Sequence, residues 1–293
     1  MLFRSKLIMR DICNENGKVI GWDEPVSAEQ KSAFMKALAG LRDLKCISFP
    51  RSIQPSRTAV RPPMLLVFGD GSSQAYAAVA YIRWELDDGS VECKVLTCKT
   101  RVAPKQKLTI PRLELLGSLA AVRLAASIKD SFTFEFGKVK FFTDSSAVLG
   151  MLQSETVTLL EFVSNRVAEI KAKSDVDKEW FWVPTDKNLA DMATRPYVEP
   201  SDLAQGSEYQ MGMDWMYLPE EQWPVRQKFG SDAAPTEERR KDLVSAVGQQ
   251  EDIPFEVTIL NRSNNYSKVV RRSEEHTSEL QSPCNLVCRL LLE

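Results

Sequence analysis

The pattern of apolar and polar positions is that of strands between residues 64 and 102 and mostly that of helices between residues 111 and 194. Residues 64–70 form a short apolar run suited to a buried central strand, and residues 75–86 alternate enough to predict a second strand. Asp87-Asp88-Gly89 then has the composition of a hairpin turn, so residues 91–102 are predicted to form a third strand. The first part of this region is therefore expected to be three strands in hairpin connection.

Helical spacing dominates the second part of the region. Pro111 can occupy the first turn of a helix, and the chain from there to Ser131 is rich in leucine and alanine. The remaining predicted elements are a strand at 139–143, helices at 145–152 and 159–173, a strand at 180–183 and a short helix at 189–194. This order predicts an α/β fold in which helices flank a mixed five-stranded sheet.

The regions on either side of this pattern are organised differently. Residues 27–44 carry apolar side chains at helical spacing, and the prolines between residues 50 and 63 indicate an extended linker. After Pro196 the pattern weakens, and residues 229–252 are charged and polar, which favours a partly disordered spacer. The expected boundaries are 1–60 for a leading segment with its linker, 61–197 for the main domain and 198–271 for the spacer.

Composition narrows the class of protein. With 293 residues and 43% apolar content, the chain is long enough to bury a substantial core. Its six cysteines form no Cys-x-x-Cys pair and do not resemble a secreted disulfide framework. No stretch approaches the roughly 20 apolar residues that span a bilayer, and the start lacks a signal-peptide pattern. We therefore expect an intracellular protein that does not cross a membrane.

The last 22 positions need separate treatment. Residues 272–293 resemble translated sequencing-library adapter, and we exclude them from the fold prediction. The chain's single histidine, His276, lies there beside Cys284 and Cys288, so a zinc site built from these residues is not expected. The rest of the chain contains no histidine, which excludes mechanisms that need a histidine base or a catalytic triad.

Charge is distributed unevenly although the formal net charge is only −2. Basic side chains crowd the stretch from Lys94 to Arg123, where Glu114 is the interior acid. Such a stripe is typical of a surface that binds phosphates, and an ordinary solvated surface is the alternative.

Four acids occupy informative places in the predicted elements. Asp70 ends the first strand, Glu114 lies in the first turns of the long helix, Asp144 closes the fourth strand and Asp191 opens the last helix. If the first and fourth strands are parallel neighbours, their acids meet at one sheet edge, and a helix packed across it brings the third acid to them. Clustered carboxylates repel one another unless cations neutralise them, so such a group usually holds Mg²⁺ or Mn²⁺. Taken singly, each acid could instead serve a turn or a helix terminus.

Five motifs in this order strongly resemble the ribonuclease H region of BEL/Pao-type LTR retrotransposon polyproteins. They are Phe68-Gly-Asp-Gly-Ser-Ser, Lys99-Thr-Arg-Val-Ala-Pro, Ile110-Pro-Arg-Leu-Glu-Leu, Phe142-Thr-Asp-Ser-Ser and Asn188-Leu-Ala-Asp-Met-Ala-Thr-Arg. The resemblance spans about residues 61–197. The leading segment looks like the connection that follows reverse transcriptase, and the region after 197 looks like the spacer toward integrase.

The resemblance implies a ribonuclease H-like fold and a metal-dependent endonuclease. Asp70, Glu114, Asp144 and Asp191 match the family's metal-binding catalytic acids, which implies two Mg²⁺ ions, with Mn²⁺ as a possible substitute. The implied reaction is hydrolysis of the RNA strand of an RNA–DNA hybrid during reverse transcription, leaving 3′-hydroxyl and 5′-phosphate ends. The implied partners are that hybrid and the reverse transcriptase and integrase portions of the polyprotein, inside a cytoplasmic retrotransposon particle.

Two departures from the family pattern are visible. The loop before the last acid, residues 183–191, lacks the histidine that many ribonucleases H carry there, which affects the expected turnover rate more than the chemistry. Gly69 and Gly71 on either side of Asp70 are unusual and are expected to loosen its geometry.

Substrate contacts are predicted from the basic stripe and from one helix start. Phosphate contacts are expected from Lys99, Arg101, Lys105 and Arg112, with Ser145 and Ser146 assisting near a helix N-terminus.

Two other functions remain open. One is a catalytically dead ribonuclease H-fold module that binds nucleic acid or spaces other domains. The other is a Pao-type aspartic peptidase, which needs two Asp-Thr/Ser-Gly loops whose carboxylates share a proton. Asp70-Gly-Ser and Asp144-Ser-Ser have the wrong order for such loops, which disfavours the peptidase.

Overall fold

The structure, a computed structural model, describes most of the chain up to residue 239. The described residues are 6–8, 10, 24–42, 47–104, 106–154, 158–195, 198–229 and 233–239. The chain divides into two units, residues 1–240 and 241–293, and every described residue belongs to the first. The adapter-like segment 272–293 and Lys105 lie outside the described residues.

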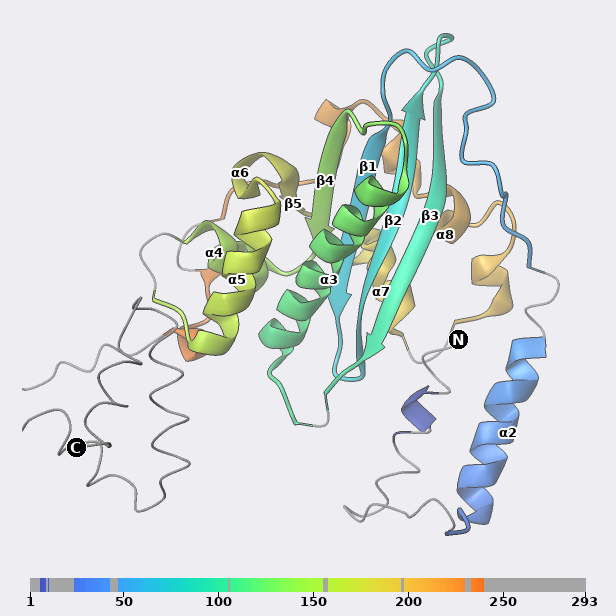
Figure 1. Ribbon diagram of the computed structural model, residues 1–293, viewed down its shortest axis with the longest axis vertical. Helices are drawn as coiled ribbons and strands as arrows, with labels where there is room; N and C mark the ends of the chain where they lie inside the picture. Colours follow the sequence, from blue (N-terminus) through green and yellow to red (C-terminus); the bar gives the residue numbers. More distant parts are fainter. Residues whose placement is uncertain are drawn as a thin grey trace, which may run out of the picture. The chain divides into compact units, whose positions relative to one another are not determined.

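A single five-stranded sheet forms the centre of the described part (Figure 1). Its strands are β1 (Met64–Gly71), β2 (Ala75–Glu85), β3 (Val91–Val102), β4 (Lys138–Thr143) and β5 (Trp180–Trp182). Their order is β3-β2-β1-β4-β5; β1 pairs antiparallel with β2 and parallel with β4, β2 and β3 are antiparallel, and β4 and β5 are parallel. The expected mixed α/β sheet with flanking helices is confirmed.

The helices lie close to their predicted positions. The α-helices are α2 (Ala28–Arg42), α3 (Ile110–Ser131), α4 (Ser146–Gln153), α5 (Glu161–Lys173), α6 (Val176–Glu179), α7 (Leu189–Thr194) and α8 (Glu208–Met211). Short 3-10 helices are η3 (Thr185–Lys187), η4 (Pro200–Leu203), η5 (Asp214–Tyr217), η6 (Glu220–Gln222) and η8 (Thr236–Glu238). Within the described ranges, no helix is both long and apolar enough to span a membrane.

Local sequence explains where the helices around the sheet begin. Pro111 stands in the first turn of α3, where its missing N–H needs no partner. Ser145 and Asn188 are the N-caps of α4 and α7, and their side-chain oxygens accept hydrogen bonds from the backbone N–H groups of Val148 and Ala190. The N-cap of α4 therefore directly follows Asp144, and the first turn of α7 contains Asp191.

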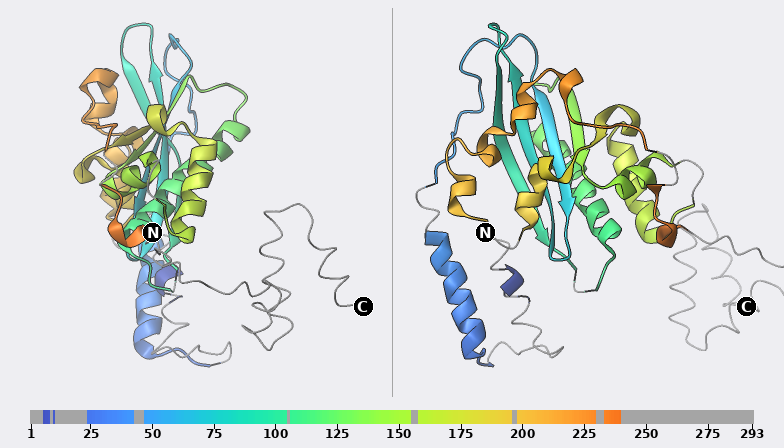
Figure 2. Two further views of the ribbon diagram at one scale, coloured as in Figure 1. Left: turned by 90° about the vertical axis from the view of Figure 1, so that its left-hand side faces the viewer. Right: turned by 180° about the vertical axis from the view of Figure 1, so that it is seen from behind.

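Strand β1 is buried along its whole length because both faces of the sheet are covered. Leu65 and Val67 belong to the core on the face of α3, while Leu66 and Phe68 belong to the core on the opposite face. Figure 2 shows α7 and the chain that follows it on that opposite face. The sheet is thus the middle layer of three.

Described residues after position 197 pack on the sheet, which the weak sequence pattern did not predict. Trp215 and Trp223 are each 6% exposed and contact the core of the second face. Phe68 and Phe142 meet the Trp215 ring with centroids 6.1 and 5.5 Å apart. The packed domain therefore extends beyond the expected boundary at 197. Trp215 lies in the 3-10 helix η5 and Trp223 directly follows η6, so these tryptophans lack the period by which strands and helices are recognised.

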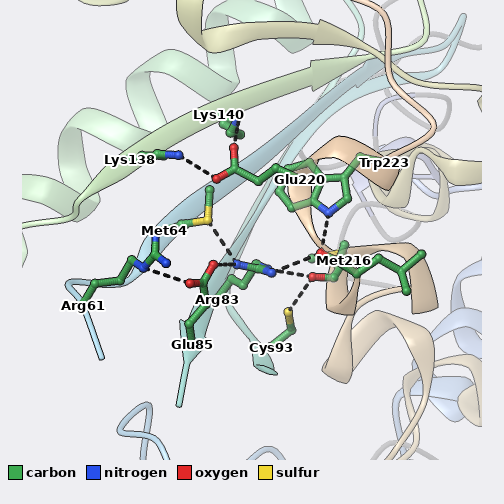
Figure 3. A network of polar contacts seen from close by, with 11 residues as sticks. Arg61, Met64, Arg83, Glu85, Cys93, Lys138, Lys140, Met216, Glu220 and Trp223 are labelled. Atoms are coloured by element: carbon green, nitrogen blue, oxygen red, sulfur yellow. Dashed lines mark hydrogen bonds and ion pairs between the residues drawn. The ribbon is translucent and has the colours of Figure 1, made fainter. Parts of the chain in front are cut away.

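A buried arginine of β2 forms hydrogen bonds with the chain around residues 216–218 (Figure 3). Arg83 is 2% exposed, and its Nε and Nη2 atoms donate to the carbonyl oxygens of Met216 and Leu218 at 2.8 and 3.1 Å. Its Nη1 atom lies 2.6 Å from Oε1 of Glu85, and its guanidinium lies over the ring of Trp223. A buried charge with these partners ties the segment specifically to the sheet.

Candidate active site

Two of the predicted acids lie at one edge of the sheet because β1 and β4 are parallel neighbours. Phe68 pairs with Phe142 in the register of these strands. Asp70 and Asp144 each follow two residues later, at the carboxyl end of their strand. The sequence-based expectation that the first and fourth strands are adjacent and parallel is confirmed.

Glycines bring the third acid to this edge. A Cβ atom on Gly71 would lie 2.2 Å from the backbone of Leu113, and one on Gly117 would lie 2.2 Å from the carbonyl oxygen of Asp70. Glu114 follows Leu113 in α3, so its backbone lies against the end of β1. The expectation that Gly69 and Gly71 loosen the geometry of Asp70 is therefore wrong. A Cβ on Gly69 would also lie too close to α3, so these glycines permit close helix–strand packing.

The fourth acid comes from α7, which packs against β1 and β2. Asp191 lies in the first turn of this helix and forms an ion pair with Arg195. Thr194, at the end of the same helix, donates its hydroxyl to Oδ2 of Asp70. Charge interactions link Asp70 to both Asp144 and Asp191, and Glu114 to Asp70 and Asp144. The structure thus brings the four acids into one cluster.

The two serines predicted to assist phosphate binding differ in their surroundings. Ser145 is buried, and its hydroxyl donates to Oε2 of Glu114 at 2.6 Å while accepting from the N–H of Val148. It therefore holds Glu114 and caps α4 in this arrangement. Ser146, the first residue of α4, is exposed.

Burial and mutual repulsion raise the pKa of two acids in the cluster. Asp70 is 9% exposed, and burial raises its pKa from 3.8 to about 6; the hydrogen bond from Thr194 opposes the rise, and the charges of Asp144 and Asp191 add to it. Burial also raises the pKa of Glu114, opposed by the hydrogen bond from Ser145 and assisted by Asp144 and Asp70. The site therefore holds negative charge at an energetic penalty that a cation would relieve.

The carboxylate oxygens of the four acids suit a hard divalent cation, although three of these carboxylates accept hydrogen bonds from protein side chains in this structure. Across the described part of the chain, no three His, Cys, Asp or Glu side chains are grouped as ligands of one ion. Instead, Asp70 accepts from Thr194, Glu114 from Ser145, and Asp144 from Asn188. Carboxylate oxygens are the ligands that Mg²⁺ and Mn²⁺ prefer. Each of these hydrogen bonds engages one oxygen of its carboxylate: Oδ2 of Asp70, Oε2 of Glu114 and Oδ1 of Asp144.

The predicted phosphate contacts on β3 are exposed. Lys99 and Arg101 both project from the strand at the edge of the sheet. Lys99 and Thr100 line a surface pocket together with Ala193 and Arg195, which belong to α7 and the residue after it. A basic side chain of β3 therefore lies on the same pocket as the end of the helix that carries Asp191.

Arg112 does not offer a free guanidinium. Its Nε lies 2.8 and 2.9 Å from the two carboxylate oxygens of Glu238, whose residue is 1% exposed. Thr109 donates to the same carboxylate at 3.0 Å, and the guanidinium also lies over the ring of Phe162. In this structure Arg112 joins the chain near residue 238 to the start of α3 through its Nε atom, and its role as a phosphate contact stays a prediction.

Sequence reasoning assigned no role to three residues of this neighbourhood: Asn188, Thr194 and Glu238. The first had a usable signal, since asparagine directly before a short helix is a preferred N-cap. Thr194 lies three residues after Asp191 on the same helix, yet its contact with Asp70 depends on how α7 packs. Glu238 lies 126 residues from Arg112 in the chain, and no local pattern reveals that pair.

A family model matches the first half of the chain. Residues 1–145 match the model described as Pao retrotransposon-like RNaseH-like domain. The match confirms the resemblance over these residues, and the motif that begins at Asn188 lies beyond it. The match contains Asp70, Glu114 and Asp144 and ends before Asp191.

Several solved ribonuclease H structures are similar at low identity, whereas no curated protein matches the chain. The N-terminal RNase H domain of Rv2228c from Mycobacterium tuberculosis, fused to maltose-binding protein, is 17% identical; the similarity covers 43% of this chain and 86% of that one, with a TM-score of 0.30. RNase H1 from Halobacterium salinarum NRC-1 is 15% identical over 46% of this chain and 94% of that one, with a TM-score of 0.31. LC11-RNase H1 in complex with an RNA/DNA hybrid is 14% identical over 44% and 91%, with a TM-score of 0.30.

Proposed function

Since this chain carries a Pao-type retrotransposon ribonuclease H region, we propose that it is a metal-dependent endonuclease that hydrolyses the RNA strand of RNA–DNA hybrids. One observation carries the proposal. Asp70 of β1, Glu114 of α3, Asp144 directly after β4 and Asp191 of α7 come together near the carboxyl ends of β1 and β4. A fold rarely gathers four carboxylates at a partly buried edge unless cations or catalysis use them.

The same four carboxylates would hold the metal ions. Two Mg²⁺ ions bound there supply water activation and stabilisation of the leaving oxygen, as in other two-metal phosphodiester hydrolases. Mn²⁺ has similar ligand preferences and is expected to substitute.

The chain's own residues prepare this site. Thr194 orients Asp70, and Ser145 orients Glu114. Because Gly71 has no side chain, the end of β1 can lie against the backbone of α3 beside Glu114. In the proposed hydrolysis, water adds its oxygen to phosphorus while the P–O3′ bond breaks. The 3′ oxygen takes up a proton and becomes a hydroxyl, and the phosphate stays bonded to the 5′ oxygen of the following nucleotide.

The surface beside the cluster fits a nucleic-acid backbone. Exposed Lys99 and Arg101 of β3 lie on the strand that borders the pocket of Arg195, and cationic side chains of this kind bind phosphates. The proposed setting is reverse transcription inside a cytoplasmic retrotransposon particle. There the domain would work beside the reverse transcriptase and integrase portions of its polyprotein.

The test is a substrate comparison with the full chain. End-labelled RNA–DNA hybrid, RNA duplex and DNA duplex are incubated with Mg²⁺, with Mn²⁺ or with EDTA, and the products are sized on denaturing gels. The proposal predicts metal-dependent cleavage of the RNA strand in the hybrid, leaving 5′-phosphate and 3′-hydroxyl ends.

Other outcomes separate the alternatives. Salt-sensitive binding of the hybrid without cleavage would favour a catalytically dead nucleic-acid-binding module. Equal cleavage in EDTA would overturn the metal-dependent mechanism.

A further inference from the structure

Asn188 is a buried polar residue at the centre of the acidic cluster. It is 3% exposed and stands directly before α7, after the 3-10 helix η3. A buried amide is stable only if its donors and acceptor find partners. Its partners therefore show what the fold uses it for.

The side chain of Asn188 contacts three separate elements of the site. Nδ2 donates to Oδ1 of Asp144 at 3.0 Å and to the carbonyl oxygen of Gly69 at 3.3 Å. Oδ1 accepts from the N–H of Ala190 at 3.2 Å. One amide group thus links the end of β4, the end of β1 and the first turn of α7.

The backbone of Asn188 adds a link to the fourth acid. The N–H of Asp191 donates to the carbonyl oxygen of Asn188 at 3.1 Å. Gly69 immediately precedes Asp70, so the chain segments that carry Asp70, Asp144 and Asp191 all contact this one residue. A displacement of Asn188 would alter the positions of these acids relative to one another.

We propose that Asn188 is a positioning residue that holds the Asp144 carboxylate and α7 in the arrangement needed to bind divalent cations. The inference rests on the proposed nuclease function and deepens it. The hydrogen bond from Asn188 to Oδ1 restricts rotation of the Asp144 carboxylate. The carboxylate therefore loses less conformational freedom when an ion binds. Hydrogen bonds that orient metal ligands typically contribute 10- to 100-fold in metal affinity or activity, roughly the size of effect expected here.

Two substitutions separate this role from helix capping. Asn188→Ser keeps a good N-cap acceptor for α7 but removes the amide donor that reaches Asp144 and Gly69. Asn188→Asp keeps the size and the capping acceptor but places a carboxylate against Asp144. Asn165→Ser, at an exposed position of α5, is the matched control for the same chemical change.

The experiment uses the full chain and has three readouts. Mn²⁺ affinity is measured by calorimetry, kcat and KM for an RNA–DNA hybrid by steady-state cleavage, and Tm by thermal unfolding in EDTA. For Asn188→Ser we expect Mn²⁺ affinity and kcat to fall about 10- to 100-fold with KM within about twofold of the unsubstituted chain. Asn188→Asp should lose at least as much kcat, and Asn165→Ser should match the unsubstituted chain.

The opposite pattern overturns the inference. If Asn188→Ser lowers Tm but leaves Mn²⁺ affinity and kcat unchanged, Asn188 is only a cap. If the unsubstituted chain cleaves no hybrid, the proposed function fails, while the Mn²⁺ titration still decides the positioning role. If that chain binds no Mn²⁺ either, there is no ligand arrangement to position and the inference fails as well.

Discussion

At the scale of single residues, the environment of Asp70 links the site to stability. Burial raises the pKa of Asp70 to about 6; the hydrogen bond from Thr194 opposes this rise, and the neighbouring acids add to it. In the unfolded chain the pKa of this carboxyl is near 3.8. The folded state therefore binds this proton more tightly. Its contribution to stability is fully present below about pH 4 and is lost as pH rises through about 6. At about 1.4 kcal/mol for each pH unit, the loss is about 3 kcal/mol.

Asp70→Asn should therefore stabilise the metal-free protein at neutral pH. Asparagine keeps an acceptor for Thr194 but carries no charge to bury. In EDTA, the Tm of the variant is expected to exceed that of the unsubstituted chain at pH 7.5, and the difference should shrink toward pH 4. Thermal unfolding across this range measures it. A difference that does not depend on pH would contradict the assigned pKa of Asp70.

At the scale of elements, the contact between β1 and α3 depends on glycine. Gly71→Ala would place a Cβ atom 2.2 Å from the backbone of Leu113, so α3 and Glu114 must move away. We expect Gly71→Ala to destabilise the fold by about 1–3 kcal/mol, as overpacking does, and to lower hybrid cleavage at least tenfold. Urea unfolding and the cleavage assay measure both effects.

Gly40 provides the matched control for this prediction. It lies within α2, and a Cβ atom there meets nothing within 4 Å. Gly40→Ala is expected to stabilise by about 0.5–1 kcal/mol through helix propensity and to leave cleavage unchanged. If both substitutions behaved alike, close packing at Gly71 would not be what positions Glu114.

The elements also show what the sequence could and could not reveal. The four acids were predictable because strand ends and helix starts have clear local signals, and the order of elements implied which strands pair. The partner of Arg112 was not predictable, because the ion pair between this arginine of α3 and Glu238 depends on tertiary packing. Paired and unpaired arginines look the same in a sequence, so the position of Arg112 in the basic stripe did not reveal its ion pair.

At the scale of the whole molecule, residues within 198–229 and 233–239 pack in the same domain as the sheet. Trp215 and Trp223 cover one face of the sheet, and Arg83 hydrogen-bonds to the backbone between them. The sequence suggested a spacer because tryptophans in irregular turns have no period, although both of these tryptophans are buried.

Truncation tests this extension of the domain. A chain ending at residue 240 keeps every described residue and serves as the reference. A chain ending at residue 200 loses both tryptophans, and removing one large buried aromatic side chain already costs about 3–5 kcal/mol. We expect it to lose its cooperative thermal transition. An unchanged Tm for the shorter chain would show that the segment is dispensable.

The central claim is that the acidic cluster cleaves RNA in a hybrid with the help of divalent cations. Its most direct test compares the full chain with Asp144→Asn in one assay, labelled RNA–DNA hybrid with Mg²⁺. Asparagine keeps a carbonyl oxygen for the bond from Asn188, so the fold and its Tm should persist. We predict that cleavage falls by more than about 100-fold. Undiminished Mg²⁺-dependent cleavage by a folded Asp144→Asn protein would contradict the account.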